Sequence, residues 1–371
     1  MRANSVACFF ELVQAGLWGK EVRLLPFEEV DYSAIQKIAE EQSVVGLVAA
    51  GLEHVSDTKV PKKEVLQFIG QTLQLEQRNQ TMNYFIGVLV DKMREAGVFT
   101  TLVKGQGVAQ CYDKPEWRAC GDVDFFLDSD NYDKAKAFLM SMATSIEQEG
   151  KYTRHLGMTI EPWSVELHGT MRCGLSSRID HCLDEIQEGA FTRGEVRVWN
   201  NSGTDIFLPN PDNDSLFILT HFLKHFYIGG IGLRQICDWI RLLWTYRSDI
   251  NLPMLDRRLR KMGLMSEWKA FGAFAVEYLG MPSEAMPFYS ADNKWKRKAK
   301  RIKDFVLKSG NFGHNRDSSY FQKYPYVIRK CISMGRRIGD LFHHAMIFPL
   351  DSLRFFPTII INGLGAAARG E

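Results

Sequence analysis

The sequence lacks several features that would place it quickly in a class of proteins. It contains no run of about eighteen apolar residues, so no transmembrane segment is expected. Its seven cysteines are scattered, without a Cys-x-x-Cys pair or a zinc-type spacing, which indicates free thiols and a cytoplasmic protein. Glu11 interrupts the apolar N-terminal stretch, so a secretory signal is not expected. The net charge of only +2 argues against binding to nucleic acid through bulk charge.

The two ends of the chain carry helical patterns. At 371 residues the chain is long for one core, and about two or three domains are expected. In residues 1–96 apolar positions recur at helical spacing; Asp31 or Ser33 caps one helix, and a long helix runs from Pro61 to about Glu95. Residues 211–371 are predicted to be helical again. The expected C-terminal helices are Leu216–Tyr227, Leu233–Tyr246, Leu252–Met262, Ser266–Leu279 and Asn293–Lys308.

The last stretch of the chain is less regular. Asn311–Tyr324 is polar and predicts a loop. The segment Ile338–Leu364 is apolar, and we expect it to be broken at Pro349 and Pro357.

Strand and helix patterns alternate between these helical ends. A β-branched apolar run at Val98–Val103 predicts a buried strand, followed by a glycine turn. The other expected elements are a short helix at Gln106–Tyr112, a strand from Asp122, a helix at Asn131–Thr144, and strands at Lys151–Ile160 and Ser164–His168. This order predicts an α+β fold with a mixed sheet in residues 97–210, between helical regions at 1–96 and 211–371.

The triplet Asp122-Val123-Asp124 is the strongest chemical signal in the chain. It opens an otherwise apolar strand, so the two carboxylates point to the same face, about 7 Å apart along the strand. Two unpaired carboxylates on one face repel each other and are costly to bury. A shared cation removes both penalties, and Mg²⁺ held in this way beside a phosphate is a common arrangement.

Three further pieces can converge on this triplet at one edge of the sheet. Lys104-Gly105 ends the first strand, Arg118 precedes the triplet, and Glu166 lies on a later strand. Carboxylates, a glycine turn and cations are the parts that phosphoryl transfer needs. Each residue also has a structural interpretation: Arg118 could pair with Asp122, Glu166 with an arginine, and Lys104 could be solvated.

The motifs resemble those of the nucleotidyltransferase superfamily. The closest likeness is to its bacterial branch of uncharacterised nucleotidyltransferases, in which a Lys-Gly turn replaces the usual Gly-Ser. The resemblance covers roughly residues 40–320, with its specific part at 102–168. The residues that carry it are Val103-Lys104-Gly105, Tyr112, Pro115, Arg118, Gly121-Asp122-Val123-Asp124 and Val165-Glu166-Leu167-His168, and more weakly Gly232–Asp238 and Gly310–Gly313.

The resemblance implies a function for these residues. Asp122 and Asp124 would bind one or two Mg²⁺ ions, and Glu166 would supply the third carboxylate. Lys104, Gly105, Arg118 and His168 would contact the substrate. The implied reaction transfers a nucleoside monophosphate from an NTP to an acceptor, which could be a small molecule, a sugar or a protein, and the implied fold is a nucleotidyltransferase-like sheet flanked by helices.

Two other functions stay open at this point. Because Lys104 stands where a serine usually contacts the triphosphate, the chain could be a weak or inactive module that binds a nucleotide or phosphate. It could also be a partner-binding scaffold of a toxin–antitoxin or polysaccharide-assembly system.

Three features lie outside these motifs. His221 and His225 are one helical turn apart, which suits core or cleft-lining residues better than a metal site, since no glutamate lies between them. Arg234 and Asp238 have the spacing of a helix ion pair that could close the site. The basic segment at residues 294–303 predicts a solvated helix face or, with the apolar tail, a peripheral contact.

Overall fold

The computed structural model describes residues 3–27, 29–150, 154–311 and 324–368. Four helices form the N-terminal region, as expected from the apolar spacing. The carboxylate of Asp31 caps the second helix by accepting a hydrogen bond from the Ala34 amide, and Pro61 directly precedes the long fourth helix. These helices are α1 (Ala3–Trp18), α2 (Tyr32–Glu41), α3 (Val45–Leu52) and α4 (Lys62–Glu95), with a short turn η1 (Leu25–Phe27).

A mixed five-stranded sheet forms the centre of the molecule. Its strand order is β1-β2-β5-β4-β3, in which β2 and β5 are parallel and the other neighbours are antiparallel. The α+β prediction is therefore confirmed. The strands are β1 (Thr101–Val103), β2 (Asp122–Phe126), β3 (Ser145–Ile146), β4 (His155–Ile160) and β5 (Trp163–His168).

The connections within this region differ in part from the prediction. α5 (Gly105–Ala109) and α6 (Ser129–Met140) follow the predicted pattern, the turn η2 (Pro115–Trp117) was not predicted, and residues 151–153 of the predicted strand lie outside the described residues. The sequence pattern did not predict α7 (Ser177–Thr192) or the hairpin of β6 (Val196–Asn201) and β7 (Thr204–Pro209).

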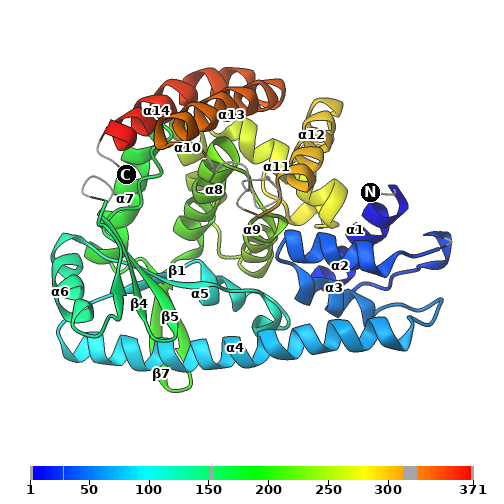
Figure 1. Cartoon of the computed structure of the whole chain (residues 1–371), viewed down its shortest axis with the longest axis horizontal. Coiled ribbons are helices and arrows are strands. Elements are labelled where there is room, and N and C mark those ends of the chain that lie inside the picture. The colour runs from blue at the N-terminus through cyan, green and yellow to red at the C-terminus, as the bar shows by residue number, and fades with distance from the viewer. Residues whose placement is uncertain (1–2, 28, 151–153, 312–323, 369–371) are drawn as a thin grey trace.

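The two faces of the sheet have different environments. One face carries Val123, Phe125, Val165 and Leu167, which are buried in a core shared with α6 and the C-terminal half of α4. Figure 1 shows α4 running along one edge of the molecule beneath the sheet and the N-terminal helices. The opposite face carries the acidic residues. The boundaries at 96/97 and 210/211 stay a prediction, and α4 contributes to the cores on both sides of the first one.

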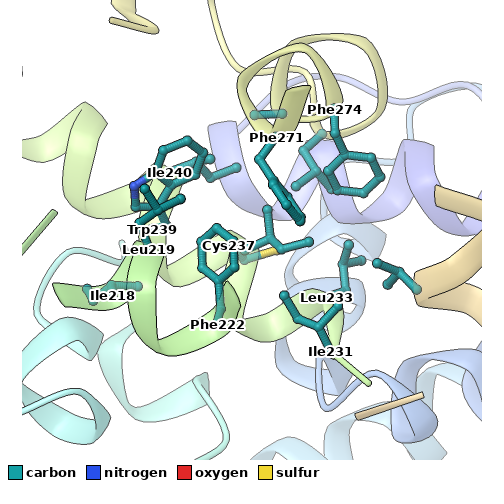
Figure 2. Packing of buried hydrophobic residues seen from close by; sticks show 14 of the residues in the cluster. Ile218, Leu219, Phe222, Ile231, Leu233, Cys237, Trp239, Ile240, Phe271 and Phe274 are labelled. Carbon is teal, nitrogen blue, oxygen red and sulfur yellow. The ribbon is translucent and has the colours of Figure 1, made fainter. Parts of the chain in front are cut away.

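Helices make up the C-terminal region. Aromatic side chains join them: Figure 2 shows Phe222 of α8 near both Trp239 of α9 and Phe271 of α11, and its ring centroid lies 5.7 and 4.9 Å from theirs. The elements are α8 (Pro211–Ile228), α9 (Leu233–Thr245), α10 (Leu252–Met262), α11 (Met265–Leu279), η3 (Ser283–Ala285), α12 (Asn293–Ser309), α13 (Tyr326–Ile347) and α14 (Pro349–Ala368).

The expected break at Pro357 was wrong. Pro349 begins α14, where a missing N–H costs nothing, but Pro357 lies inside the helix. Phe355 and Ile359 on either side of it are buried in the main core, and this burial outweighs the lost backbone hydrogen bond. Most of the predicted loop at Asn311–Tyr324 lies outside the described residues. Within the described part of the chain, no helix is long and apolar enough to cross a membrane.

Candidate active site

Strand register brings the three predicted carboxylates together. In the parallel pair of β2 and β5, Asp124 lies opposite Glu166, and Asp122 lies two residues away on the same face. One oxygen from each of the three carboxylates lies within 4.8 Å of the other two. This spacing leaves room for a cation between three oxygen ligands.

Lys104 reaches into this cluster from the end of β1. Its backbone adopts a positive φ of 56°, which is costly for a residue with a side chain and is common at functional turns. Its ammonium group lies 2.7 Å from Oδ1 of Asp124, a carboxylate that is only 2% exposed. Burial opposes the charge of Lys104, but Asp124 more than compensates, so the pKa of Lys104 is raised and the lysine stays charged.

His168 sits between two of the carboxylates. Its Nε2 lies 2.8 Å from Oδ1 of Asp124 and 3.3 Å from Oε2 of Glu166. Burial favours the protonated form of Asp124, but Lys104 and His168 outweigh it, so the pKa of Asp124 is lowered. Hydrogen bonds from His155 and His168 hold the pKa of Glu166 well below its usual range. Both acids are therefore carboxylates at neutral pH.

Asp122 is the exception among the three acids. Repulsion from Asp124, followed by burial, raises the pKa of Asp122. Among the described residues, none forms a hydrogen bond or ion pair with its carboxylate. Lys104 and Arg234 compensate the charge of Asp122 only in part, and a bound cation would relieve the remainder, so the donor set fits a hard divalent ion.

A pocket opens beside these residues, and helices α8 and α9 form its other wall. Gly105, with a φ of +39°, lines the pocket where the chain turns from β1 into α5. Residues of the helical region, among them Arg234 and Asp238, thus line the pocket beside the acidic cluster. The lining residues are Lys104, Gly105, Val108, Arg118, Asp122, Asp124, Ile218, His221, Phe222, Arg234, Gln235 and Asp238.

Arg118 is paired with Asp238 of α9, and not with Asp122. Its Nε and Nη2 donate to the two oxygens of Asp238 at 3.0 and 2.6 Å, and Tyr112 donates to the same carboxylate at 2.8 Å. The expected ion pair of Arg234 with Asp238 does not form; Arg234 donates instead to the carbonyl of Ala119. These contacts fasten α9 to the loop that precedes β2.

Helix α8 carries a histidine pair, of which His221 lines the same pocket. His221 and His225 have their Nε2 atoms 3.1 Å apart. Burial lowers the pKa of both rings, to about 4 for His225, so both are neutral at neutral pH. In the described residues no third ligand joins them into a metal-binding group, and the lining role proposed for His221 agrees with its position.

His155 is a site residue that the sequence reasoning missed. It lies opposite His168 in the antiparallel pair of β4 and β5, and its Nε2 is 3.1 Å from Oε2 of Glu166. Part of the signal was present, because only residues 161–163 separate the two predicted strands, and so short a connection favours an antiparallel hairpin. The register that sets residue 155 opposite residue 168 depends on β5 starting at Trp163, one residue before the predicted start.

The basic segment at residues 294–303 belongs to α12. Its Trp295, Ala299 and Ile302 are buried against the other helices, while Lys294 and Lys298 lie over the Trp295 ring. A solvated basic face on a packed helix explains this pattern. A peripheral contact through the tail stays a prediction.

No curated protein and no solved structure matches this chain significantly. A family model described as uncharacterised nucleotidyltransferase matches residues 28–280, which include the sheet, the three carboxylates, Lys104 and helices α8 and α9. The segment Gly310–Gly313 lies beyond this match. Since the match spans more than half of the chain, the protein belongs to this nucleotidyltransferase family.

Proposed function

We propose that the protein transfers a nucleoside monophosphate from an NTP to an acceptor, with Mg²⁺ as cofactor. The observation that carries this proposal is the cluster of Asp122, Asp124 and Glu166, whose oxygens lie within 4.8 Å at the wall of a pocket. In the reaction an acceptor oxygen forms a bond to the α-phosphorus, and the bond to the departing pyrophosphate breaks.

The carboxylates would hold the metal. Mg²⁺ prefers carboxylate oxygens, and when bound it would offset charge on the triphosphate. Glu166 suits the part of a ligand better than that of a base, because its lowered pKa makes it a weak proton acceptor. His155 and His168 orient its carboxylate by holding Oε2 from two sides.

The remaining pocket residues divide between the two substrates. Lys104 and Gly105 lie on the sheet side beside the acids, where the lysine would offset charge on the phosphates. His221, Phe222 and Gln235 lie on the helical side, and we assign them to the acceptor. This wall contains an apolar ring, an amide and a neutral imidazole, which suits a small polar molecule, a sugar or a protein side chain.

Paired substitutions test the site assignment. Thermal unfolding with each NTP, with and without Mg²⁺, measures binding, and pyrophosphate release over candidate acceptors measures turnover. Asp122→Asn with Asp124→Asn is expected to abolish the Mg²⁺-dependent part of both signals. The matched control is Asp130→Asn with Asp133→Asn, which removes two charges from α6 away from the pocket. Unchanged Mg²⁺-dependent binding in the first variant would show that the site is assigned wrongly.

One observation favours a second candidate, a module that binds a nucleotide without turnover. The Lys104 ammonium already lies on Asp124, where it supplies part of the positive charge that a metal would bring. Stabilisation by an NTP without pyrophosphate release would support this candidate. Lys104→Ala separates the two further: if the lysine competes with the metal, the variant binds Mg²⁺ more tightly.

A further inference from the structure

A second group of metal-ligating atoms lies beside the acidic cluster. It consists of Nε2 of His155, Oε2 of Glu166 and Nε2 of His168, which all lie within 4.8 Å of one another. The register of β4 and β5 creates it, because His155 pairs with His168 and Gly157 pairs with Glu166. Three polar side chains thus project from one face of two neighbouring strands.

The distances in this group match those between neighbouring ligands of one metal ion. The Glu166 oxygen lies 3.1 Å from the His155 nitrogen and 3.3 Å from the His168 nitrogen. Ligands about 2.0–2.1 Å from a tetrahedral zinc ion lie about 3.3 Å from each other. An ion could therefore be bound with little movement of the three side chains.

Gly157 provides room for one more carboxylate at this place. A Cβ at residue 157 would lie 2.5 Å from a carboxylate oxygen of Glu147, so the Glu147 carboxylate occupies the space that any other side chain would fill. Because residue 157 pairs with Glu166 and is two residues from His155, this space is on the same face as the histidines. Glu147 thus has a carboxylate beside the group that could supply a fourth ligand after a movement of its side chain.

We propose that His155, Glu166 and His168 bind one divalent transition-metal ion of the zinc class, separate from the Mg²⁺ of the acidic cluster. Two imidazoles and one carboxylate favour Zn²⁺ and its neighbours in the first transition row over Mg²⁺, which prefers oxygen ligands alone. The metal would bind to the Nε2 lone pairs of the two histidines, so His168 would give up its contact with Asp124. Asp124 would keep its ion pair with Lys104. Glu166 would then link the two sites. The inference goes beyond nucleotidyl transfer and does not depend on it.

Titration calorimetry with Zn²⁺ alone tests the proposal on the untagged full chain after removal of metals with a chelator. One Zn²⁺ per chain is expected to bind, and excess Mg²⁺ is expected not to displace it. His155→Ala and His168→Ala should each weaken binding at least about tenfold. His225→Ala and the exposed His181→Ala are matched controls that each remove one imidazole elsewhere, and Asp122→Asn removes only the acidic cluster.

The proposal is overturned if the wild-type chain binds no Zn²⁺, or if the His155 and His168 variants bind Zn²⁺ as tightly as the wild type does. Loss of binding in His225→Ala alone would also overturn it, because the site would then be on α8. His155 has a side chain that is 37% exposed, so its replacement leaves the core in place. A measurement on the wild-type protein avoids variants that could misfold. Zn²⁺ should protect His155 and His168 from carbethoxylation. Equal modification of both histidines with and without Zn²⁺ would refute the site.

Discussion

The pair of Arg118 and Asp238 makes a quantitative prediction about how the helical region is held against the sheet. Both side chains are buried, at 6% and 8% exposure, and the guanidinium donates to both carboxylate oxygens. Asp238→Asn keeps the shape of the side chain but removes its charge. Arg118 is then left as a buried cation that keeps its hydrogen bond to the Ala119 carbonyl but has lost its charged partner, and Tyr112 loses a charged acceptor.

The expected cost follows from the chemistry of this contact. Removing one partner of a buried ion pair costs about 3–5 kcal/mol, because the remaining charge keeps its desolvation penalty without compensation. Asp238 strengthens the charged form of Arg118, whose pKa is raised although burial alone would lower it. Replacing both residues, as in Arg118→Met with Asp238→Leu, removes both charges and should cost less than the sum of the single changes.

Urea unfolding measures these free energies. The midpoint should fall in Asp238→Asn, with an unchanged denaturant slope. Asp256→Asn is the matched control, because it breaks the exposed i,i+4 pair with Arg260 on α10 and should have no measurable effect. A loss below about 1 kcal/mol in Asp238→Asn, or equal effects of the two changes, would refute the argument that this pair fastens α9.

Three further predictions concern stability. Gly46→Ala should lower the free energy of unfolding by about 1–3 kcal/mol in thermal unfolding, because the new Cβ would lie 2.0 Å from the carbonyl oxygen of Trp117. Its control Gly70→Ala, on α4, has free space around the new Cβ and should raise the free energy of unfolding by about 0.5–1 kcal/mol. Burial raises the pKa of Glu267 to about 8 from 4.5, so the folded state holds a proton that the unfolded chain has lost, and the free energy of unfolding falls as pH rises through this window. Glu267→Gln should remove that slope, at most about 1.4 kcal/mol per pH unit in urea unfolding; an unchanged slope would contradict it. Asp122→Asn should raise the metal-free melting temperature, by relieving repulsion worth about 1 kcal/mol or less, while Mg²⁺ should no longer stabilise the variant.

The sequence predicted the residues of the site better than it predicted their partners. Asp122 and Asp124 could be placed on one face from the period of a strand alone, and the strand around Glu166 was recognisable in the same way. Which strands are neighbours is a property of the whole sheet. The parallel pairing of β2 with β5, which sets Glu166 opposite Asp124, is not encoded in any short pattern.

Arg118 shows why partners are harder to predict than positions. The partner expected from the sequence is Asp122, four residues away, but the observed partner Asp238 is 120 residues away on α9. Burial decides the outcome: Asp238 is buried and also accepts a hydrogen bond from Tyr112, so its charge needs a partner, whereas Asp122 is half-buried. The packing of α9 beside the sheet selects the pair of Arg118 and Asp238, and the spacing of residues along the sequence does not predict it.

Lys104 stands where other nucleotidyltransferases usually have a serine, and the structure shows how this lysine changes the site. Val103 is the residue of β1 that pairs with Asp124, so the next residue is the first one free to turn its side chain toward the acids. The positive φ of Lys104 makes this turn and brings Nζ to 2.7 Å from Asp124. A serine at this position could not reach the carboxylate in the same way, since its side chain is shorter and uncharged. The exchange of serine for lysine therefore changes the charge within the acidic cluster itself: the net charge of Asp122, Asp124, Glu166 and residue 104 falls in magnitude by one unit. A cluster with less negative charge binds its cation less tightly, and we expect this chain to need more Mg²⁺ than its Lys104→Ser variant to reach half-maximal stabilisation, a difference that thermal unfolding across a Mg²⁺ series measures directly.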